Sequence, residues 1–217
     1  MPEAVFFDLD GTLADTAPDL ASALNRLRAE EGKTPVCESL LRPWTSNGVA
    51  GMLWAGFSIA RQDSDFARLS NRFLALYEQS ICEHTRLFDG IPAVLAELEC
   101  RGIRWGVVTN KSIRFTVPLL KALDLDKRAS AIVGGDSAAK PKPAPDPLFL
   151  ACAQASVNAS GCVYVGDHAR DIIAGRAAGM HTVAASYGYL DEDCRIGDWN
   201  ADTVISRPLD LLGLLAA

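Results

Sequence analysis

Two aspartates, Asp8 and Asp10, directly follow a short apolar segment near the N-terminus. Residues two apart in a strand project to the same side, so these two carboxylates would lie close together. Like charges at that distance repel, and such a pair is stable only with a bound cation or a shared proton. The pair therefore indicates metal binding or acid–base chemistry. Solvated acids at a strand end, or a helix cap, are the structural alternative.

A second pair of acids, Asp167 and Asp171, lies in the C-terminal third of the chain. Their spacing of four places both side chains on one face of a helix, if the helix has begun by then. On their own they favour a helix cap and a first-turn acid that suits the helix dipole. Together with Asp8 they supply hard oxygen ligands from two strand ends, the ligand type that Mg²⁺ prefers. We therefore expect a magnesium site.

Groups that could bind phosphate occur at two other places. Thr109 and Asn110 end an apolar segment, where a hydroxyl and the amides of a following helix could hold phosphate oxygens. An ordinary helix cap is the alternative there. Two lysines, Lys140 and Lys142, lie in a proline-rich segment whose rigidity would fix where their ammonium groups point. The functional hypothesis is an ammonium held against phosphate charge, and the alternative is a rigid exposed linker.

The expected strands would bring these groups to one edge of a sheet. Five apolar segments typical of buried strands occur at residues 4–9, 103–109, 131–134, 162–165 and 181–186. Helical patterns separate them, and this alternation predicts an α/β fold with a Rossmann-like parallel sheet and helices on both faces. In such sheets ligands bind beyond the carboxyl ends of the strands, which is where Asp8, Thr109 and Asp167 would lie.

The segment between the first two expected strands has helical spacing and no strand-like alternation. Thr16 is predicted to cap its first helix, with Asp19 as the partner in a capping box. We therefore predict a small all-helical domain, residues 16–82, inserted after the first strand. The α/β core would comprise residues 1–15 and 83–217.

The composition is that of a globular protein, with 49% hydrophobic and 22% charged residues in a chain of 217. The formal net charge of −6 gives no basic excess for nucleic-acid binding. No run reaches the ~18 apolar residues of a membrane helix, and no basic, apolar leader precedes the first strand. Six cysteines without C-x-x-C spacing argue against a zinc site. We expect a soluble, cytoplasmic monomer or homodimer that binds neither nucleic acid nor membrane.

These groups occur in the order of the sequence motifs of the haloacid dehalogenase superfamily, and they cover the chain from end to end. Residues 8–15 (Asp-Leu-Asp-Gly-Thr-Leu-Ala-Asp) resemble the first motif and Thr109-Asn110 resembles the second. Residues 166–171 resemble the fourth motif. For the third motif, alignment on the following Asp-Pro-Leu favours Lys142, and Lys140 is the alternative.

The resemblance implies a role for each group. Asp8 would be the nucleophile that forms an aspartyl-phosphate, and Asp10 the general acid and base. The cofactor would be Mg²⁺, held by Asp8, the main-chain carbonyl of Asp10, Asp167 and, through water or as support, Asp171. The phosphoryl group would be bound by Thr109, Asn110 and Lys142. An acid at position 10 indicates a phosphatase, because an alkoxide leaving group needs a proton and a halide does not.

The position of the insertion resembles the helical cap of the phosphoglycolate phosphatase-like branch of this superfamily. Residues 41–49 resemble its cap segment, although Thr45-Ser46 departs from the more common glycine-containing form. The resemblance implies that Arg42 meets a substrate carboxylate or phosphate and that Ser46 and Asn47 donate hydrogen bonds. Surface ion pairing and helix capping are the alternatives for these three residues.

Further segments are similar to N-acetylmuramic acid 6-phosphate phosphatases, namely residues 87–90, 105–111, 166–180 and 187–190. Phosphoglycolate phosphatases share much of this pattern. The resemblance therefore implies a small phosphorylated metabolite as substrate, either N-acetylmuramic acid 6-phosphate or 2-phosphoglycolate.

Two other functions fit the same motifs. A phosphosugar mutase would share every core residue but would return the phosphate to the sugar and release little free phosphate. A non-catalytic, metabolite-binding regulator would have no need of Asp10.

Overall fold

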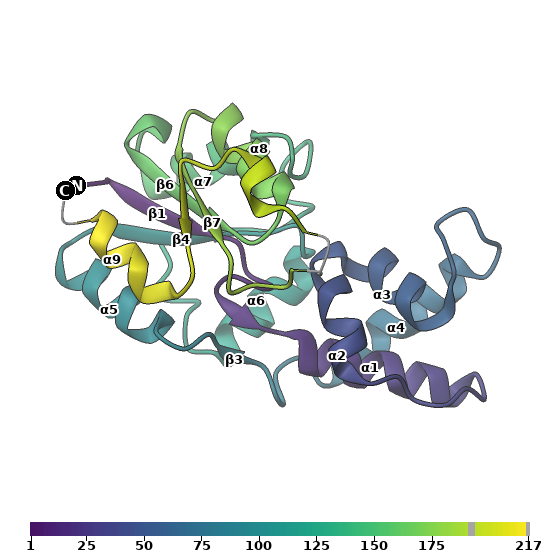
Figure 1. The fold of residues 1–217 in the computed structure, drawn as a ribbon. Coiled ribbons are helices and arrows are strands. Elements are labelled where there is room, and N and C mark those ends of the chain that lie inside the picture. The colour runs from purple at the N-terminus through teal and green to yellow at the C-terminus, as the bar shows by residue number, and fades with distance from the viewer. Residues whose placement is uncertain (191–193, 216–217) are drawn as a thin grey trace.

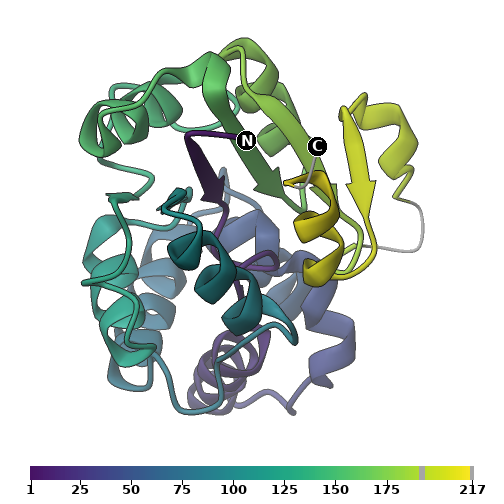
Figure 2. The ribbon, with the colours of Figure 1, turned by 90° about the vertical axis from the view of Figure 1, so that its left-hand side faces the viewer.

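The centre of the molecule is a six-stranded parallel sheet in the order β5-β4-β1-β6-β7-β8 (Figures 1 and 2). The computed structural model describes residues 1–190 and 194–215. The strands of the sheet are β1 (Ala4–Phe7), β4 (Arg104–Val108), β5 (Ala131–Val133), β6 (Cys162–Gly166), β7 (His181–Ala185) and β8 (Thr203–Ile205). The predicted α/β class is confirmed, and β8 extends the sheet by a strand that the sequence pattern did not predict.

Helices cover both faces of this sheet, and β1 shows why. Val5 and Phe7 belong to the apolar cluster on one face, whereas Ala4 and Phe6 belong to the cluster on the other. All four are buried, as a central strand between two helical layers requires. The first layer contains α5 (Ile91–Cys100), α6 (Ile113–Ala122) and α9 (Leu211–Leu214). The second layer contains α7 (Asp146–Ala155) and α8 (Ala169–Ala177).

A second group of helices stands beyond the carboxyl ends of the strands (Figure 1). It comprises α1 (Ala17–Glu30), α2 (Glu38–Leu41), a 3-10 helix (Arg42–Asn47), α3 (Gly48–Phe57) and α4 (Phe66–Gln79). These helices pack around an apolar cluster of their own, which Phe115 of α6 joins from the sheet layer. Two short antiparallel strands at its base, β2 (Ala14–Asp15) and β3 (Arg86–Leu87), place the exit and the return of the chain side by side.

Other local structure is limited to short connections. Three more 3-10 helices lie at Ala159–Gly161, Ile196–Trp199 and Pro208–Asp210. Across the described residues, no helix combines the length and the apolar character needed to cross a membrane.

The start of α1 is held by a distant part of the chain. The predicted helix cap by Thr16 is wrong, because its side chain makes no capping bond and donates instead to Asp10 (2.6 Å). The hydroxyl of Tyr189 accepts hydrogen bonds from the amides of Thr16 (2.6 Å) and Ala17 (3.0 Å). The same hydroxyl donates to Asp15 (2.7 Å). A side chain that follows β7, far along the sequence, therefore satisfies the first amides of the helical group.

Asp19 joins the two segments that connect the helical group to the sheet. It does not complete a capping box with Thr16, because its carboxylate accepts hydrogen bonds from the amides of His84 (2.9 Å) and Thr85 (2.9 Å) and from the Thr85 hydroxyl (2.7 Å). Only 1% of Asp19 is exposed. Its removal would leave buried donors without a partner, which costs more than the hydrogen bonds alone.

We therefore expect Asp19→Ala to lower the free energy of unfolding by about 2–4 kcal/mol, measured by urea denaturation. Glu78→Ala on exposed α4 surface is the control and should change this free energy by less than about 0.5 kcal/mol. Equal, small effects in both variants would show that Asp19 does not hold the two connections.

Candidate active site

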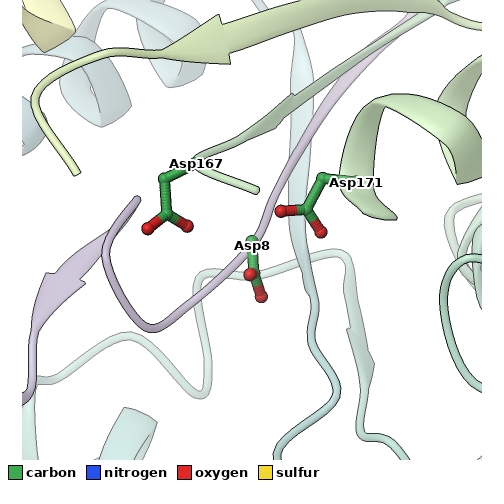
Figure 3. A group of neighbouring side chains, drawn as sticks. All are labelled: Asp8, Asp167 and Asp171. Carbon is green, nitrogen blue, oxygen red and sulfur yellow. The ribbon is translucent and has the colours of Figure 1, made fainter. Parts of the chain in front are cut away.

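Three aspartates meet at the carboxyl edge of the sheet. Figure 3 shows Asp8 at the end of β1, Asp167 at the end of β6 and Asp171 in α8. One carboxylate oxygen from each lies within 4.8 Å of the others, and all three side chains are buried. The strands β1 and β6 are neighbours, with Phe7 opposite Val165, so the residues that follow them emerge side by side. The structure thus brings together the three acids predicted as metal ligands.

Lys142 lies among these acids. Its ammonium is 3.0 Å from Asp8 Oδ1 and 2.7 Å from Asp171 Oδ1, and its side chain is completely buried. It also donates to the carbonyl of Val108 (2.9 Å). Lys140 is exposed on the surface. Of the two lysines considered from the sequence, the structure therefore brings Lys142 to the acids.

The other predicted phosphate-binding segment, Thr109-Asn110, forms hydrogen bonds with the backbone of Lys142. The Asn110 side chain donates to the Lys142 carbonyl (2.9 Å) and accepts from the Lys142 amide (3.0 Å). Thr109 is buried, and its hydroxyl accepts a hydrogen bond from the Lys111 amide (3.2 Å). Both Thr109 and Asn110 line the cavity above the acids. The side chain of Asn110 is thus already engaged in positioning the Lys142 backbone.

The three carboxylates differ in their protonation. Burial by itself would raise the pKa of Asp8, but the charges of Lys142 and Arg170 outweigh burial and hold that pKa below its usual value. Burial, followed by the negative charges of Asp8 and Asp171, raises the pKa of Asp167 to about 7. Burial also raises the pKa of Asp171, although Lys142 opposes this. Asp8 is therefore the acid best held as a carboxylate.

The donor set at Asp167 fits a divalent cation. Its carboxylate accepts hydrogen bonds from the Thr12 hydroxyl (3.1 Å), the Ser46 hydroxyl (3.0 Å) and the Tyr189 amide (3.0 Å), all of them neutral donors. Lys142 is shared between the other two acids, so the cluster carries more negative than positive charge at close range. Buried carboxylates in this arrangement are the hard oxygen ligands typical of Mg²⁺ sites.

Asp10 is directed to a different set of partners. Its Oδ1 accepts from the Lys111 ammonium (2.8 Å) as well as from Thr16, and its side chain is not one of the three clustered acids. The Lys111 ammonium lies 4.7 Å from the ring centre of Tyr77 in α4. Burial would lower the pKa of Lys111, but Asp10 and Tyr77 raise it, so the ammonium stays charged. Lys111 was not assigned a role from the sequence, since a lysine after a strand end is common on protein surfaces.

Residues of the helical group reach the acids from above. Ser46 binds Asp167, and the guanidinium of Arg170 donates to the main-chain carbonyl of Ser46. Asn47 Oδ1 lies 3.2 Å from His168 Nε2. The Nε of Arg170 is buried and has no hydrogen-bond partner among the described residues. Arg170 is therefore a further functional candidate. It lies inside the fourth motif, but no role was assigned to it from the sequence.

Arg42 does not lie in the cavity. Its guanidinium pairs with Asp15 (2.7 Å) and Glu38 (3.3 Å) and stacks on the ring of Tyr189 at 5.0 Å. The predicted substrate contact of Arg42 is thus replaced by contacts at the base of the helical group. The arginine that this group places on the cavity wall is Arg61.

The cavity has a volume of about 530 Å³ and separates the sheet edge from α3 and α4. Asp8 and Asp10 line its floor together with Thr109 and Lys111. A size of this order is typical of sites for small molecules. The arrangement joins an ionised carboxylate, a second acid and cationic groups around one cavity, which suits transfer of an anionic group.

Comparisons with known proteins agree with this geometry. Residues 5–185 match the family model described as haloacid dehalogenase-like hydrolase. The chain belongs to the haloacid dehalogenase-like hydrolases. An N-acetylmuramic acid 6-phosphate phosphatase from Pseudomonas aeruginosa is 38% identical over 213 residues, covering 98% of this chain and 94% of that protein. A phosphoglycolate phosphatase from Xanthomonas campestris pv. campestris is 41% identical over 215 residues, covering 97% and 95%.

A solved structure of this family has the same architecture. The crystal structure of a predicted phosphoglycolate phosphatase from Haemophilus somnus 129pt superimposes with a TM-score of 0.86 at 27% identity, covering 98% of this chain and 97% of that one. Within the haloacid dehalogenase-like hydrolases, the relatives are phosphatases, and this chain is an enzyme of that class.

Metal binding by the acid cluster of this hydrolase can be tested without a substrate. We expect Asp167→Asn to weaken Mg²⁺ binding at least about 10-fold in isothermal titration calorimetry, because a charged oxygen ligand becomes a neutral amide. Asp126→Asn, outside the cavity, should bind Mg²⁺ like the unaltered protein. Equal affinity in all three proteins would mean that Asp167 is not a ligand.

Proposed function

We propose that this enzyme is a Mg²⁺-dependent phosphomonoester hydrolase that acts through an aspartyl-phosphate on a small phosphorylated metabolite. The observation that carries the proposal is the setting of Asp8. This buried carboxylate is held ionised beside Lys142, within the three-acid cluster, at the floor of the cavity. Asp10 lines the same floor and has its own hydrogen-bond partners.

Each residue has a chemical task in this proposal. An Asp8 oxygen attacks phosphorus while the ester bond to the leaving oxygen breaks, and Asp10 gives that oxygen a proton. Asp10 then takes a proton from water, the water oxygen attacks phosphorus, and the bond to Asp8 breaks to release phosphate. Lys142 and the Thr109 hydroxyl stabilise the charge on the transferring oxygens.

The metal site would be formed by Asp8, Asp167 and the main-chain carbonyl of Asp10, with Asp171 in support. When bound, Mg²⁺ supplies positive charge that shields the phosphoryl oxygens from the carboxylate nucleophile. Lys142 shares its charge between Asp8 and Asp171, which keeps both acids in place.

We further propose that residues 16–82 form a cap domain that closes the cavity. The helices of this segment wall off the acids, and both Ser46 and Asn47 bind residues at the carboxyl edge of the sheet. Closure of this kind excludes water and strengthens the electrostatic interactions within the site.

The names of the relatives suggest two substrates, N-acetylmuramic acid 6-phosphate and 2-phosphoglycolate. Both molecules combine a phosphate ester with a carboxylate. We propose that the substrate of this enzyme is of this class.

Replacing the nucleophile provides the direct test. Asp8→Asn should abolish release of phosphate from N-acetylmuramic acid 6-phosphate, 2-phosphoglycolate and common sugar phosphates, because an amide cannot form the acyl phosphate. Circular dichroism should show a folded protein. Substantial turnover by a folded variant would refute the nucleophile, and wild-type turnover without net free phosphate would indicate a phosphosugar mutase.

The role of Asp10 makes a different prediction, which depends on the leaving group. Asp10→Asn should lower kcat about 100-fold or more for a sugar phosphate, whose alkoxide needs a proton. The loss should be smaller for p-nitrophenyl phosphate, whose phenolate leaves without one. Steady-state phosphate release with both substrates measures the difference, and an identical loss for both would contradict general-acid catalysis by Asp10.

A further inference from the structure

One face of α4 lines the catalytic cavity along nearly the whole helix. Phe66, Ser70, Phe73 and Tyr77 follow one another at intervals of three or four residues, and all four line the cavity. The 11 residue steps from Phe66 to Tyr77 correspond to about 16 Å along the helix axis. The cavity is therefore a channel that runs along α4 and not a pocket confined to the phosphate site.

Two aromatic residues of α4 and their cationic neighbours identify the two ends of this channel. Tyr77 marks the catalytic end, because its ring lies over the ammonium of Lys111, which is bonded to Asp10. Phe66 marks the far end, where the guanidinium of Arg61 lies 5.8 Å from its ring centre. Arg61 itself lines the cavity. Arg61 and Lys111 therefore lie near opposite ends of the face of α4 that lines the cavity.

The wall between these ends is largely apolar. The cavity lining includes Val49 and Met52 of α3 and Phe73 and Leu74 of α4. A surface of this kind contacts carbon-rich parts of a ligand, and it leaves charge recognition to the ends.

Arg61 differs from the other cations of the channel in its partners. Lys111 is paired with Asp10, and Arg170 donates to the carbonyl of Ser46. No carboxylate among the described residues forms an ion pair with Arg61, whose guanidinium lies over the Phe66 ring. Its planar fork of donors remains open to an anion and matches a single carboxylate.

Resting on the proposed phosphatase function, we propose that Arg61 is a specificity-determining residue that binds a carboxylate at the far end of a sugar-sized phosphate ester. A single guanidinium suits a carboxylate better than a second phosphate, whose two charges call for more cations. The two-carbon 2-phosphoglycolate spans only roughly 5 Å at bond lengths of about 1.5 Å, which is short against the rise of about 16 Å along α4 between Phe66 and Tyr77.

A pyranose with phosphate on one side and a lactyl carboxylate on the other spans on the order of 10 Å. Of the two substrate classes proposed above, the channel therefore fits N-acetylmuramic acid 6-phosphate, with its sugar ring against the apolar wall.

A matched pair of substrates tests this inference. N-acetylglucosamine 6-phosphate has the same sugar and phosphate but lacks the lactyl group that carries the carboxylate. Arg61→Gln should raise KM for N-acetylmuramic acid 6-phosphate about 10- to 100-fold with little change in kcat, because a charge-assisted contact distant from phosphorus is lost. KM for N-acetylglucosamine 6-phosphate and for 2-phosphoglycolate should stay the same.

Arg68→Gln is the control, since Arg68 is an exposed arginine of the same helical group that pairs with Glu31 and does not line the cavity. It should leave all three KM values unchanged. An Arg61→Gln enzyme with unchanged KM for every substrate, or with equal losses on both sugars, would overturn the role of Arg61 and leave the proposed phosphatase intact. If the unaltered enzyme released phosphate from none of the three substrates, the proposed function and this inference would both be overturned.

Discussion

The burial of three carboxylates around one ammonium is the constraint on which the rest of this molecule depends. Asp8, Asp167 and Asp171 lie together with their side chains buried, where repulsion between like charges is poorly screened. Lys142 offsets part of this charge and must itself be held without solvent. Its ammonium is satisfied by the Val108 carbonyl and the Tyr164 hydroxyl as well as by the acids. A buried ion cluster of this kind is costly unless every donor has a partner.

The turn after β1 packs very closely against this cluster. After β1 the backbone turns at Gly11 with φ +87, and a Cβ there would lie 2.1 Å from Asp167 Oδ2. Glycine is required at this point both by the left-handed backbone and by the lack of space. The turn that carries Asp8 and Asp10 can therefore pack directly against the end of β6. Local sequence and the register of two neighbouring strands together determine the distance between the clustered acids.

Much of this arrangement could be predicted from the sequence, because it follows local rules. Apolar runs that end in acids predicted strands whose carboxyl ends carry Asp8 and Asp167, and parallel topology then places those ends together. The contacts made by Tyr189 and Asp19 could not be predicted, because each depends on how remote segments pack. Thr16 has the sequence features of a helix cap, yet a tyrosine 173 residues away supplies the acceptor.

The positions of the arginines in the helical group also depend on contacts between remote segments, which the sequence does not reveal. Arg42 was selected through its neighbours in sequence, whereas the partner that captures it, Asp15, lies on the connecting strand β2. Arg61 lies in a connection between two helices and carries no local pattern, so only the path of α4 along the cavity reveals its position. Helical periodicity predicts that α4 has an apolar face, but not that this face is shared between the interior and a ligand channel.

Tyr189 links the geometry of the acids to the position of the helical group. Its amide donates to Asp167, and its hydroxyl binds the first amides of α1 and Asp15. The Ser46 hydroxyl donates to the same carboxylate oxygen, and Arg170 donates to the Ser46 carbonyl. Any shift of the helices relative to the sheet must therefore alter contacts to Asp167. Because the same helical group carries the channel wall and Arg61, its position affects both the channel and the contacts of Asp167.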